Sequence, residues 1–524
     1  MASRQVLTRS LAISFCMSRL ERTVDFLVQR IEEISGPRQA SPSATSSIGH
    51  VSSDPGLRVP LEEPSSAPLF VLRDVAAEAG VQAPQDDTNT LNLRLKGRDI
   101  IASGLLTGQD ASTLLSLFNE HYGRWVVFNP STTPERLLAE VRSSPLLLSA
   151  CCLIAIRHTT QDLASRIAPR LFQEAKELLS AAMLAVPQSL DFFQASLIMS
   201  MWSTTISQMP LSVDSWLLSG FALQHSLATN MFRPVTNMSD PSATRKSALD
   251  RLCVWNHLCL VHLHYCVGTR RKAMLDRQQI DRCRGILDSD HVTNFESRMV
   301  GEVHLYWIIY ESCWATPVDL PKTQAALWKW KEDWKFLFDQ PRSQFIQMGF
   351  HFAQLIIYDQ SLKTRSAAVR ESLLSEMVRL STAIINLAME TTDDRTRHLT
   401  DHIYHMIAFA AVTLSRIMHL YESQLPASYN LVELDNLVLS LVSWLHSIGL
   451  PCHVAYTLGD VVASFHKKLR PNAQLSPTNS YEDADPFSQE DFASLFPELF
   501  GTTSYEGSIG NLLPDWGPIN YPSN

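Results

Sequence analysis

Four residues whose side chains can bind metal ions or transfer protons lie in the segment RHLTDHIYH: His398, Asp401, His402 and His405. His398, His402 and His405 share one face of an expected helix, and imidazoles at this spacing can converge on zinc. The glutamate of zincin motifs is absent, and no fourth ligand is evident. We therefore interpret the segment as a polar helix flank and predict no metal site in this chain.

The cysteines do not have the spacing of a metal site either. Cys253, Cys259 and Cys266 recur at helical intervals, Cys151 and Cys152 are adjacent, and the sequence contains no C-x2-C pair. Most of the nine cysteines fall within apolar helical patterns, which favours buried, reduced thiols in an intracellular protein over a disulfide framework.

No set of residues predicts catalysis. The sequence has no nucleophile elbow, P-loop, dinucleotide fingerprint or paired-carboxylate motif, so we predict no catalytic residue, no cofactor and no enzyme activity. The basic cluster Arg270-Arg271-Lys272 is typical of a solvated loop, with phosphate contact or a weak nuclear import signal as the alternatives. We interpret Trp328, Trp330, Trp334 and Phe338 as core packing.

The elements that would position these residues are helices. Apolar residues recur at three- and four-residue spacing, and alternating strand patterns are nearly absent, so we predict an all-α fold of antiparallel helices. Besides a central stretch over 214–288 and a short helix at Leu69–Ala79, the expected helices are Gln109–Tyr122, Pro145–His158, Ala168–Ala185, Ser189–Gln208, Asn294–Cys313, Thr323–Phe338, Arg342–Arg365, Arg370–Glu390, Arg397–Ser423, Asn430–Ser447 and Cys452–Leu469.

Several of these stretches resemble the middle homology region of fungal zinc binuclear cluster transcription factors, and most of all the regulators of secreted-protease genes. The likeness rests on DSWLLSG beginning at Asp214, on RQQIDRCRGILD ending at Asp288, on VGEVHLYWII over 300–309 and on WKWKEDWKFLF over 328–338. It extends from about Leu105 to Lys468. The resemblance implies a DNA-binding regulator of RNA polymerase II transcription in the nucleus, with a helical regulatory body. Secreted-protease genes are one expected target and secondary-metabolite gene clusters the alternative.

The N-terminal residues have the period of a coiled coil. Seven apolar residues alternate four and three apart with charged flanks, which predicts a dimerisation helix over residues 1–35, and the residue pattern alone also allows an amphipathic helix packed on its own body. The resemblance favours a coil that forms a homodimer or heterodimer and sets the spacing of two DNA half-sites. The predicted seam consists of Ile13, Met17, Leu20, Val24, Leu27, Ile31 and Ile34.

The zinc module that the resemblance implies is not in this sequence. It would precede the coil, yet only Cys16 lies before residue 150, and isolated cysteines cannot assemble a two-zinc cluster. Either the sequence lacks an upstream exon, which we favour, or the protein acts without its own DNA contact, through a dimer partner or as a competitor. A helical scaffold or sensor without a DNA role is the remaining alternative.

Two stretches flank the helical body, which we expect over 100–470. Residues 36–99 begin with a Ser- and Pro-rich run without aromatic residues, typical of a flexible linker. Residues 471–524 contain eight acidic residues and no Lys or Arg, so nearly all of the formal net charge of −9 lies there. Acidic and aromatic residues alternate, which predicts a disordered activation segment that docks on coactivators. Its expected contact residues are Phe487, Phe492, Leu495, Phe496, Leu499, Phe500 and Trp516.

The sequence does not predict a membrane partner. No run of about 18 uncharged apolar residues is present, which is the length that a membrane-spanning helix requires.

Overall fold

The computed structural model describes residues 68–80 and most of 99–473. The gaps within the second range are 203–212, 230, 233–241, 290–291, 315–317, 363–365, 392–393, 426–428, 452 and 472. The chain divides into two units, residues 1–85 and residues 86–524. In the first, the described residues form the single helix α2 (Pro68–Glu78), where the sequence predicted Leu69–Ala79.

The second unit is helical throughout its described part, and no strand occurs there, so the all-α prediction is confirmed. Local sequence signals explain where many helices begin. The Thr107 hydroxyl accepts a hydrogen bond from the Asp110 amide (3.0 Å), and the Asp214 carboxylate accepts one from Leu217 (3.1 Å). Asp276 and Gln279 form a capping box, and Pro145 occupies the first turn of its helix. These residues satisfy or remove the unpaired amide donors of a first helical turn.

The N-terminal half of this unit packs around α6. This helix is apolar on all sides, and each of its residues is buried. α4, α5, α7 and α8 contact it, and α9 contacts α8. The bounds are α4 (Gly108–His121), α5 (Pro134–Val141), α6 (Pro145–Ala155), α7 (Gln161–Ala182), α8 (Leu190–Met201) and α9 (Ser215–Leu227), with the 3-10 turns η2 (Gly123–Val126) and η3 (Ile156–His158).

The C-terminal half packs around α14 and α16. α15 contacts both of these helices and α17, while α18 lies against α16 and α17. The bounds are α13 (Leu320–Asp333), α14 (Gln344–Ser361), α15 (Ala367–Met389), α16 (Asp401–Leu420), α17 (Leu431–Ser447) and α18 (Val454–Leu469). The 3-10 turns are η5 (Lys335–Leu337), η7 (Asp394–His398) and η8 (Glu422–Gln424).

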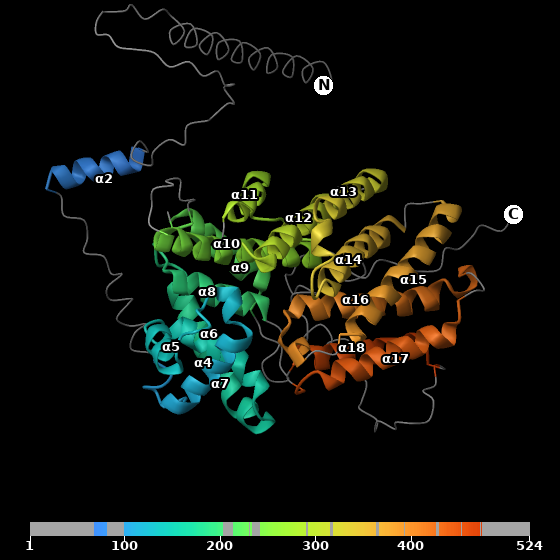
Figure 1. The fold of residues 1–524 in the computed structure, drawn as a ribbon, viewed down its shortest axis with the longest axis horizontal. Helices are drawn as coiled ribbons and strands as arrows, with labels where there is room; N and C mark the ends of the chain where they lie inside the picture. The colour runs from blue at the N-terminus through green and yellow to red at the C-terminus, as the bar shows by residue number, and fades with distance from the viewer. Residues whose placement is uncertain are drawn as a thin grey trace, which may run out of the picture. The chain divides into compact units, whose positions relative to one another are not determined.

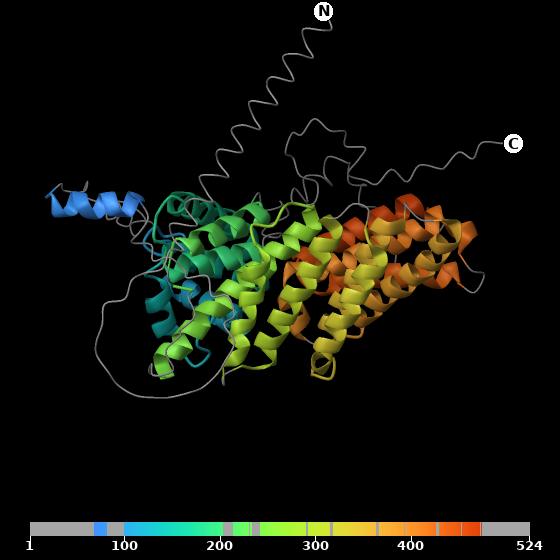
Figure 2. The same ribbon diagram turned by 90° about the horizontal axis from the view of Figure 1, so that it is seen from above.

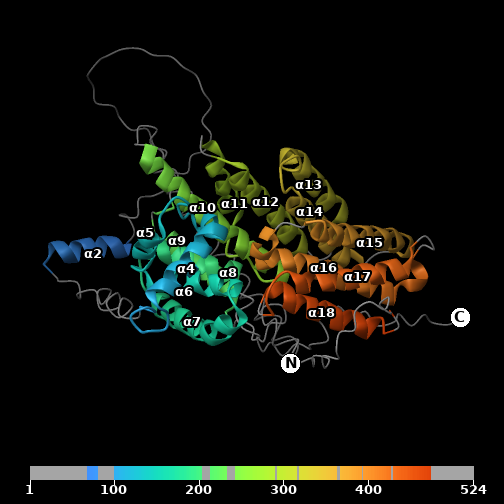
Figure 3. The same cartoon turned by 60° about the horizontal axis from the view of Figure 1, so that its bottom comes forward.

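Two long helices join the halves. α10 (Ser242–Thr269) packs on α8 and α9 and against α12 (Asn294–Trp314), which in turn packs on α13 and α14. The short α11 (Arg277–Arg282) and η4 (Cys283–Asp288) lie between them in the chain. α4 to α9 therefore lie on one side of α12 and α15 to α18 on the other, as Figures 1, 2 and 3 show.

Some predicted helix limits were wrong. α5 was not predicted, and α8 ends at Met201 rather than near Gln208. The stretch predicted as one helix from Arg397 is divided, because η7 ends at His398 and α16 starts at Asp401. Gly268 is of a residue type that often ends a helix, but α10 ends at Thr269, and Arg270 takes the left-handed conformation after it, with φ of 53°.

Helix α16 has the length and mean hydropathy of a membrane span, and it is the one helix of the described residues that does. Its 18-residue apolar window is 61% buried, however, by contacts that include α14, α15 and α18. Burial of this kind is what a central helix of a multi-helix core requires.

Candidate functional site

The halves meet at a cluster of buried and half-buried polar side chains, which we call the junction cluster: Tyr122, Arg157, His158, His398 and Asp401. Tyr122 follows α4, Arg157 and His158 form the end of η3, His398 ends η7 and Asp401 begins α16. Arg157 is 2% exposed and Asp401 is fully buried. Because a helix N-terminus favours negative charge, α16 itself supports the Asp401 carboxylate.

Arg157 is the centre of the junction cluster. Its Nη1 lies 3.5 Å from Asp401 Oδ1, its Nη2 donates to the Tyr122 hydroxyl (3.3 Å), and its Nε donates to His158 Nε2 (3.4 Å). Burial lowers the pKa of Arg157, but Tyr122 and Asp401 outweigh this effect and leave the pKa above its ordinary value. The guanidinium therefore stays charged, and each of its nitrogens faces a polar group.

Imidazole rings extend from the junction cluster to the surface. His121 stacks on His398 with ring centroids 3.7 Å apart, and His398 lies 4.3 Å from His158. His398 Nδ1 is 3.2 Å from the Tyr122 hydroxyl, which also hydrogen-bonds with His158 Nε2. Burial and the Arg157 charge strongly lower the pKa of His158, and burial with the His121 and Arg157 charges lowers that of His398 to about 3. Both rings are neutral at pH 7, as Nε2 of His158 must be to accept a hydrogen bond.

Side chains from both halves form hydrogen bonds with the backbone around η7. Trp202, at the end of α8, donates from Nε1 to Leu399 O (3.0 Å). His453 caps α18, with its Nδ1 accepting from the Ala455 amide (3.1 Å) and its Nε2 bonding Arg397 O (2.9 Å). The junction cluster and these hydrogen bonds thus connect the segment after α6 with the starts of α16 and α18.

The four metal-binding candidates of the sequence do not converge. His398 stacks on His121, while His402 stacks on His264 with centroids 3.7 Å apart and hydrogen-bonds with Tyr306. Among the described residues, no three His, Cys, Asp or Glu side chains are placed to hold a metal ion. The interpretation as a polar helix flank was also wrong, because Asp401 is fully buried.

The DSWLLSG motif binds the basic loop that follows α10. Arg271 forms an ion pair with Asp214, and its guanidinium lies 5.1 Å from the centre of the Trp216 ring. Trp216 Nε1 donates to Lys272 O (3.1 Å). The solvated-loop interpretation therefore holds for the exposed Arg270 and Lys272 but is wrong for Arg271.

The tryptophan-rich motif contacts the VGEVHLYWII motif. Trp330 is buried and donates from Nε1 to Gly301 O (2.8 Å). A Cβ at Gly301 would lie 3.1 Å from Leu337 and 3.3 Å from Trp334. Core packing is confirmed for Trp330 and Trp334, but Trp328 is 54% exposed and was wrongly assigned to the core.

The cysteines of the described residues behave as core residues. Burial raises the pKa of Cys152 and of Cys266 to about 12, which keeps both thiols protonated. Cys313 is half-buried, and the buried set is Cys151, Cys152, Cys253, Cys259, Cys266 and Cys283.

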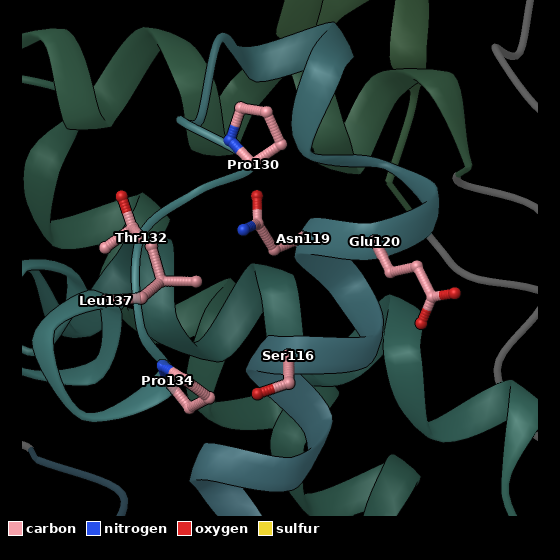
Figure 4. Close-up of a pocket in the computed structure, with 7 residues that line it drawn as sticks. All are labelled: Ser116, Asn119, Glu120, Pro130, Thr132, Pro134 and Leu137. Atoms are coloured by element: carbon pink, nitrogen blue, oxygen red, sulfur yellow. The ribbon is translucent and has the colours of Figure 1, made fainter.

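A surface hollow of about 360 Å³ lies between α4 and α5 (Figure 4). Ser116, Asn119 and Glu120 line it from α4, facing the loop and first turns that carry Pro130, Thr132, Pro134 and Leu137. Ser116 Oγ donates to Ser112 O (2.8 Å) and Asn119 Nδ2 to Asn129 O (3.3 Å), so these polar groups serve local structure. The hollow holds no set of residues for acid–base or nucleophilic chemistry.

The functional residues predicted from the sequence lie outside the described residues. These are the dimerisation seam, Ile13, Met17, Leu20, Val24, Leu27, Ile31 and Ile34, and the activation segment, Phe487, Phe492, Leu495, Phe496, Leu499, Phe500 and Trp516. The junction cluster, by contrast, was not predicted. The sequence singled out His398 and Asp401 only as metal-binding candidates, and the further signal was the pair Arg157-His158 at the end of a mostly apolar helix.

Comparison with known proteins gives the family. The middle domain of the transcriptional activator of proteases prtT matches residues 104–469. A transcriptional regulatory protein of Schizosaccharomyces pombe is 28% identical over 387 residues, 71% of each chain. The transcriptional activators of proteases prtT of Penicillium rubens and Aspergillus clavatus are 27% and 23% identical, over 66% and 80% of this chain.

The chain spans 52% of the Penicillium relative and 65% of the Aspergillus relative. No solved structure matches it. The family match covers the stretch in which the sequence showed its resemblance, and it includes every residue of the junction cluster. The chain therefore belongs to the family of the prtT middle domain, a family of fungal transcriptional regulators.

Proposed function

We propose that this protein is a nuclear activator of RNA polymerase II transcription whose targets include genes for secreted proteases. The observation that carries the proposal is the family match over 104–469, together with relatives named as activators of proteases. A family of transcription regulators also implies a non-enzymatic role.

Each part of the chain has a role in this proposal. The seam from Ile13 to Ile34 pairs two subunits, and a zinc module or a partner that carries one supplies the contact with promoter DNA. The helical body regulates the assembly, with the junction cluster setting how its two halves are held. The acidic segment recruits coactivators through Phe492, Phe496 and Phe500.

Deletion of the gene in its own fungus, followed by RNA sequencing on a protein carbon source, tests the target class. Loss of secreted-protease transcripts and of casein clearing supports the proposal. Changes confined to a secondary-metabolite cluster would overturn it.

Replacing Phe492, Phe496 and Phe500 by alanine tests the activation segment. With the protein level unchanged on immunoblots, this variant should lower the same transcripts. Tyr481→Ala, outside the contact set, is the matched control.

A further inference from the structure

The basic loop after α10 is held in one conformation by hydrogen bonds. Lys272 O accepts from Trp216 (3.1 Å), the Ala273 amide donates to the Tyr310 hydroxyl (3.0 Å), and the Met274 amide donates to His262 Nε2 (3.0 Å). The Arg271–Asp214 ion pair adds a fourth attachment. A short polar loop fixed at this many points loses little entropy when a partner binds.

This rigid loop presents cations beside exposed apolar side chains. Leu217 on α9 is 54% exposed and Met274 is 42% exposed, and Met274 Cγ would lie 3.4 Å from a Cβ at Gly220, one turn after Leu217. Arg270 and Lys272 are exposed, and neither forms an ion pair with another residue of the described ranges. We call Leu217, Arg270, Lys272 and Met274 the loop patch.

We propose that the loop patch binds the acidic C-terminal segment of the same chain, from Glu482 to Trp516. Charge complementarity carries the argument: residues 471–524 contain eight carboxylates and no Lys or Arg, and the loop patch offers two exposed cations, Arg270 and Lys272. The aromatic residues between those carboxylates match the exposed Leu217 and Met274. A phosphate backbone would use the cations but gain nothing from these two apolar side chains, which favours a peptide as the occupant.

The segment is long enough to reach the loop patch. α18 ends at Leu469, and the 23 residues from there to Phe492 span up to about 80 Å when extended. A compact body of about 370 residues has a radius of gyration of about 21 Å, so a linker of this length can run over most of its surface. Bound in this way, Phe492 and Phe496 would be covered and withheld from coactivators. This consequence rests on the proposed function, but the contact itself does not.

Photocrosslinking in the full-length protein tests the contact. Phe496 is replaced by p-benzoyl-phenylalanine, which on irradiation attaches preferentially to nearby methionine side chains, and the crosslinked peptides are identified by mass spectrometry. We expect crosslinks to the peptide that contains Met274. A mixture of isotope-labelled and unlabelled protein distinguishes contact within one chain from contact between two.

Charge reversal makes the test specific. Arg270→Glu with Lys272→Glu should lower the Met274 crosslink about fivefold or more, and Glu490→Lys with Asp491→Lys in the same chain should restore it. Lys322→Glu, at another exposed lysine, is the control and should leave the yield unchanged. Circular dichroism checks that the variants fold. Crosslinks elsewhere, crosslinks only between chains, or no effect of the reversal would overturn the proposal, and none of these results bears on which genes the protein controls.

Discussion

Arg157 and Asp401 are 244 positions apart in the sequence and form an ion pair in which both side chains are buried. Each side chain carries a charge inside the protein that the other offsets. The pair therefore joins the N-terminal and C-terminal halves by a buried, charge-balanced contact.

Removal of either charge should strongly destabilise the fold. Arg157→Met or Asp401→Leu is expected to lower the free energy of unfolding by about 3–5 kcal/mol, because the remaining charged group stays buried. Double substitution with Arg157→Met and Asp401→Leu should cost less than the sum of the single changes. Urea denaturation measures the free energy of unfolding of the two single variants and of the double variant. Arg136→Ala, at a 75% exposed residue paired with Glu140, is the control and should cost less than about 1 kcal/mol. Equal effects at the two sites would contradict the role of the buried pair.

Acid should destabilise the protein through its buried neutral histidines. Burial is the largest cause at each of three rings and lowers the pKa of His257, His264 and His453 to about 3. The unfolded chain binds protons on these rings near pH 6.5 while the folded chain does not, so stability falls as pH drops below about 6.5. Between pH 7 and pH 5, protonation of each ring in the unfolded chain should lower the free energy of unfolding by about 2 kcal/mol.

The measurement is urea denaturation at both pH values. His453→Asn keeps a good helix-capping residue but cannot titrate, so its loss of stability between pH 7 and pH 5 should be smaller than that of the natural protein by about 2 kcal/mol. An unchanged pH dependence in this variant would show that His453 is not held neutral in the folded state.

Two helical glycines should respond in opposite directions to alanine. At Gly301 the added methyl group would press on Leu337 and Trp334, both buried, and we expect a loss of about 1–3 kcal/mol. At Gly268 no atom lies within 4 Å of the added methyl group, so alanine should stabilise α10 by up to about 1 kcal/mol. Thermal denaturation measures the change in stability that alanine causes at each position. A change of the same sign at both positions would contradict the close approach at Gly301.

The ion pair of Asp214 can be separated from its helix cap. Asp214→Asn preserves the cap on Leu217 but removes the charge that faces Arg271, and should cost about 0.5–1 kcal/mol. Asp214→Ala removes both and should cost about 1 kcal/mol more. Chemical denaturation of the two variants gives the difference directly. If the alanine variant is no less stable than the asparagine variant, the cap contributes nothing.

The sequence by itself determined the fold class and most of the helices. Repeats such as Leu434, Leu441 and Leu445 predict the buried face of α17, and the structure buries all three. Helix starts were predictable wherever a cap or a proline marked them, as at Pro145. Helix ends were harder to predict. Gly268 is of a residue type that often ends a helix, but the left-handed turn after α10 falls at Arg270. Such patterns are readable because helical periodicity and capping depend on residues within a few positions of one another.

Tertiary structure alone decided which polar residues meet. Spacing placed His398 and His402 on one helical face, yet they contact different rings, His121 and His264, from different helices. The packing of the helices also leaves Trp328 exposed and buries Asp401. A periodic pattern shows which face of a helix is apolar, but not which other helix that face will contact. The Arg157–Asp401 pair depends on the tertiary contact between η3, which follows α6, and the start of α16, and no single stretch of sequence contains both.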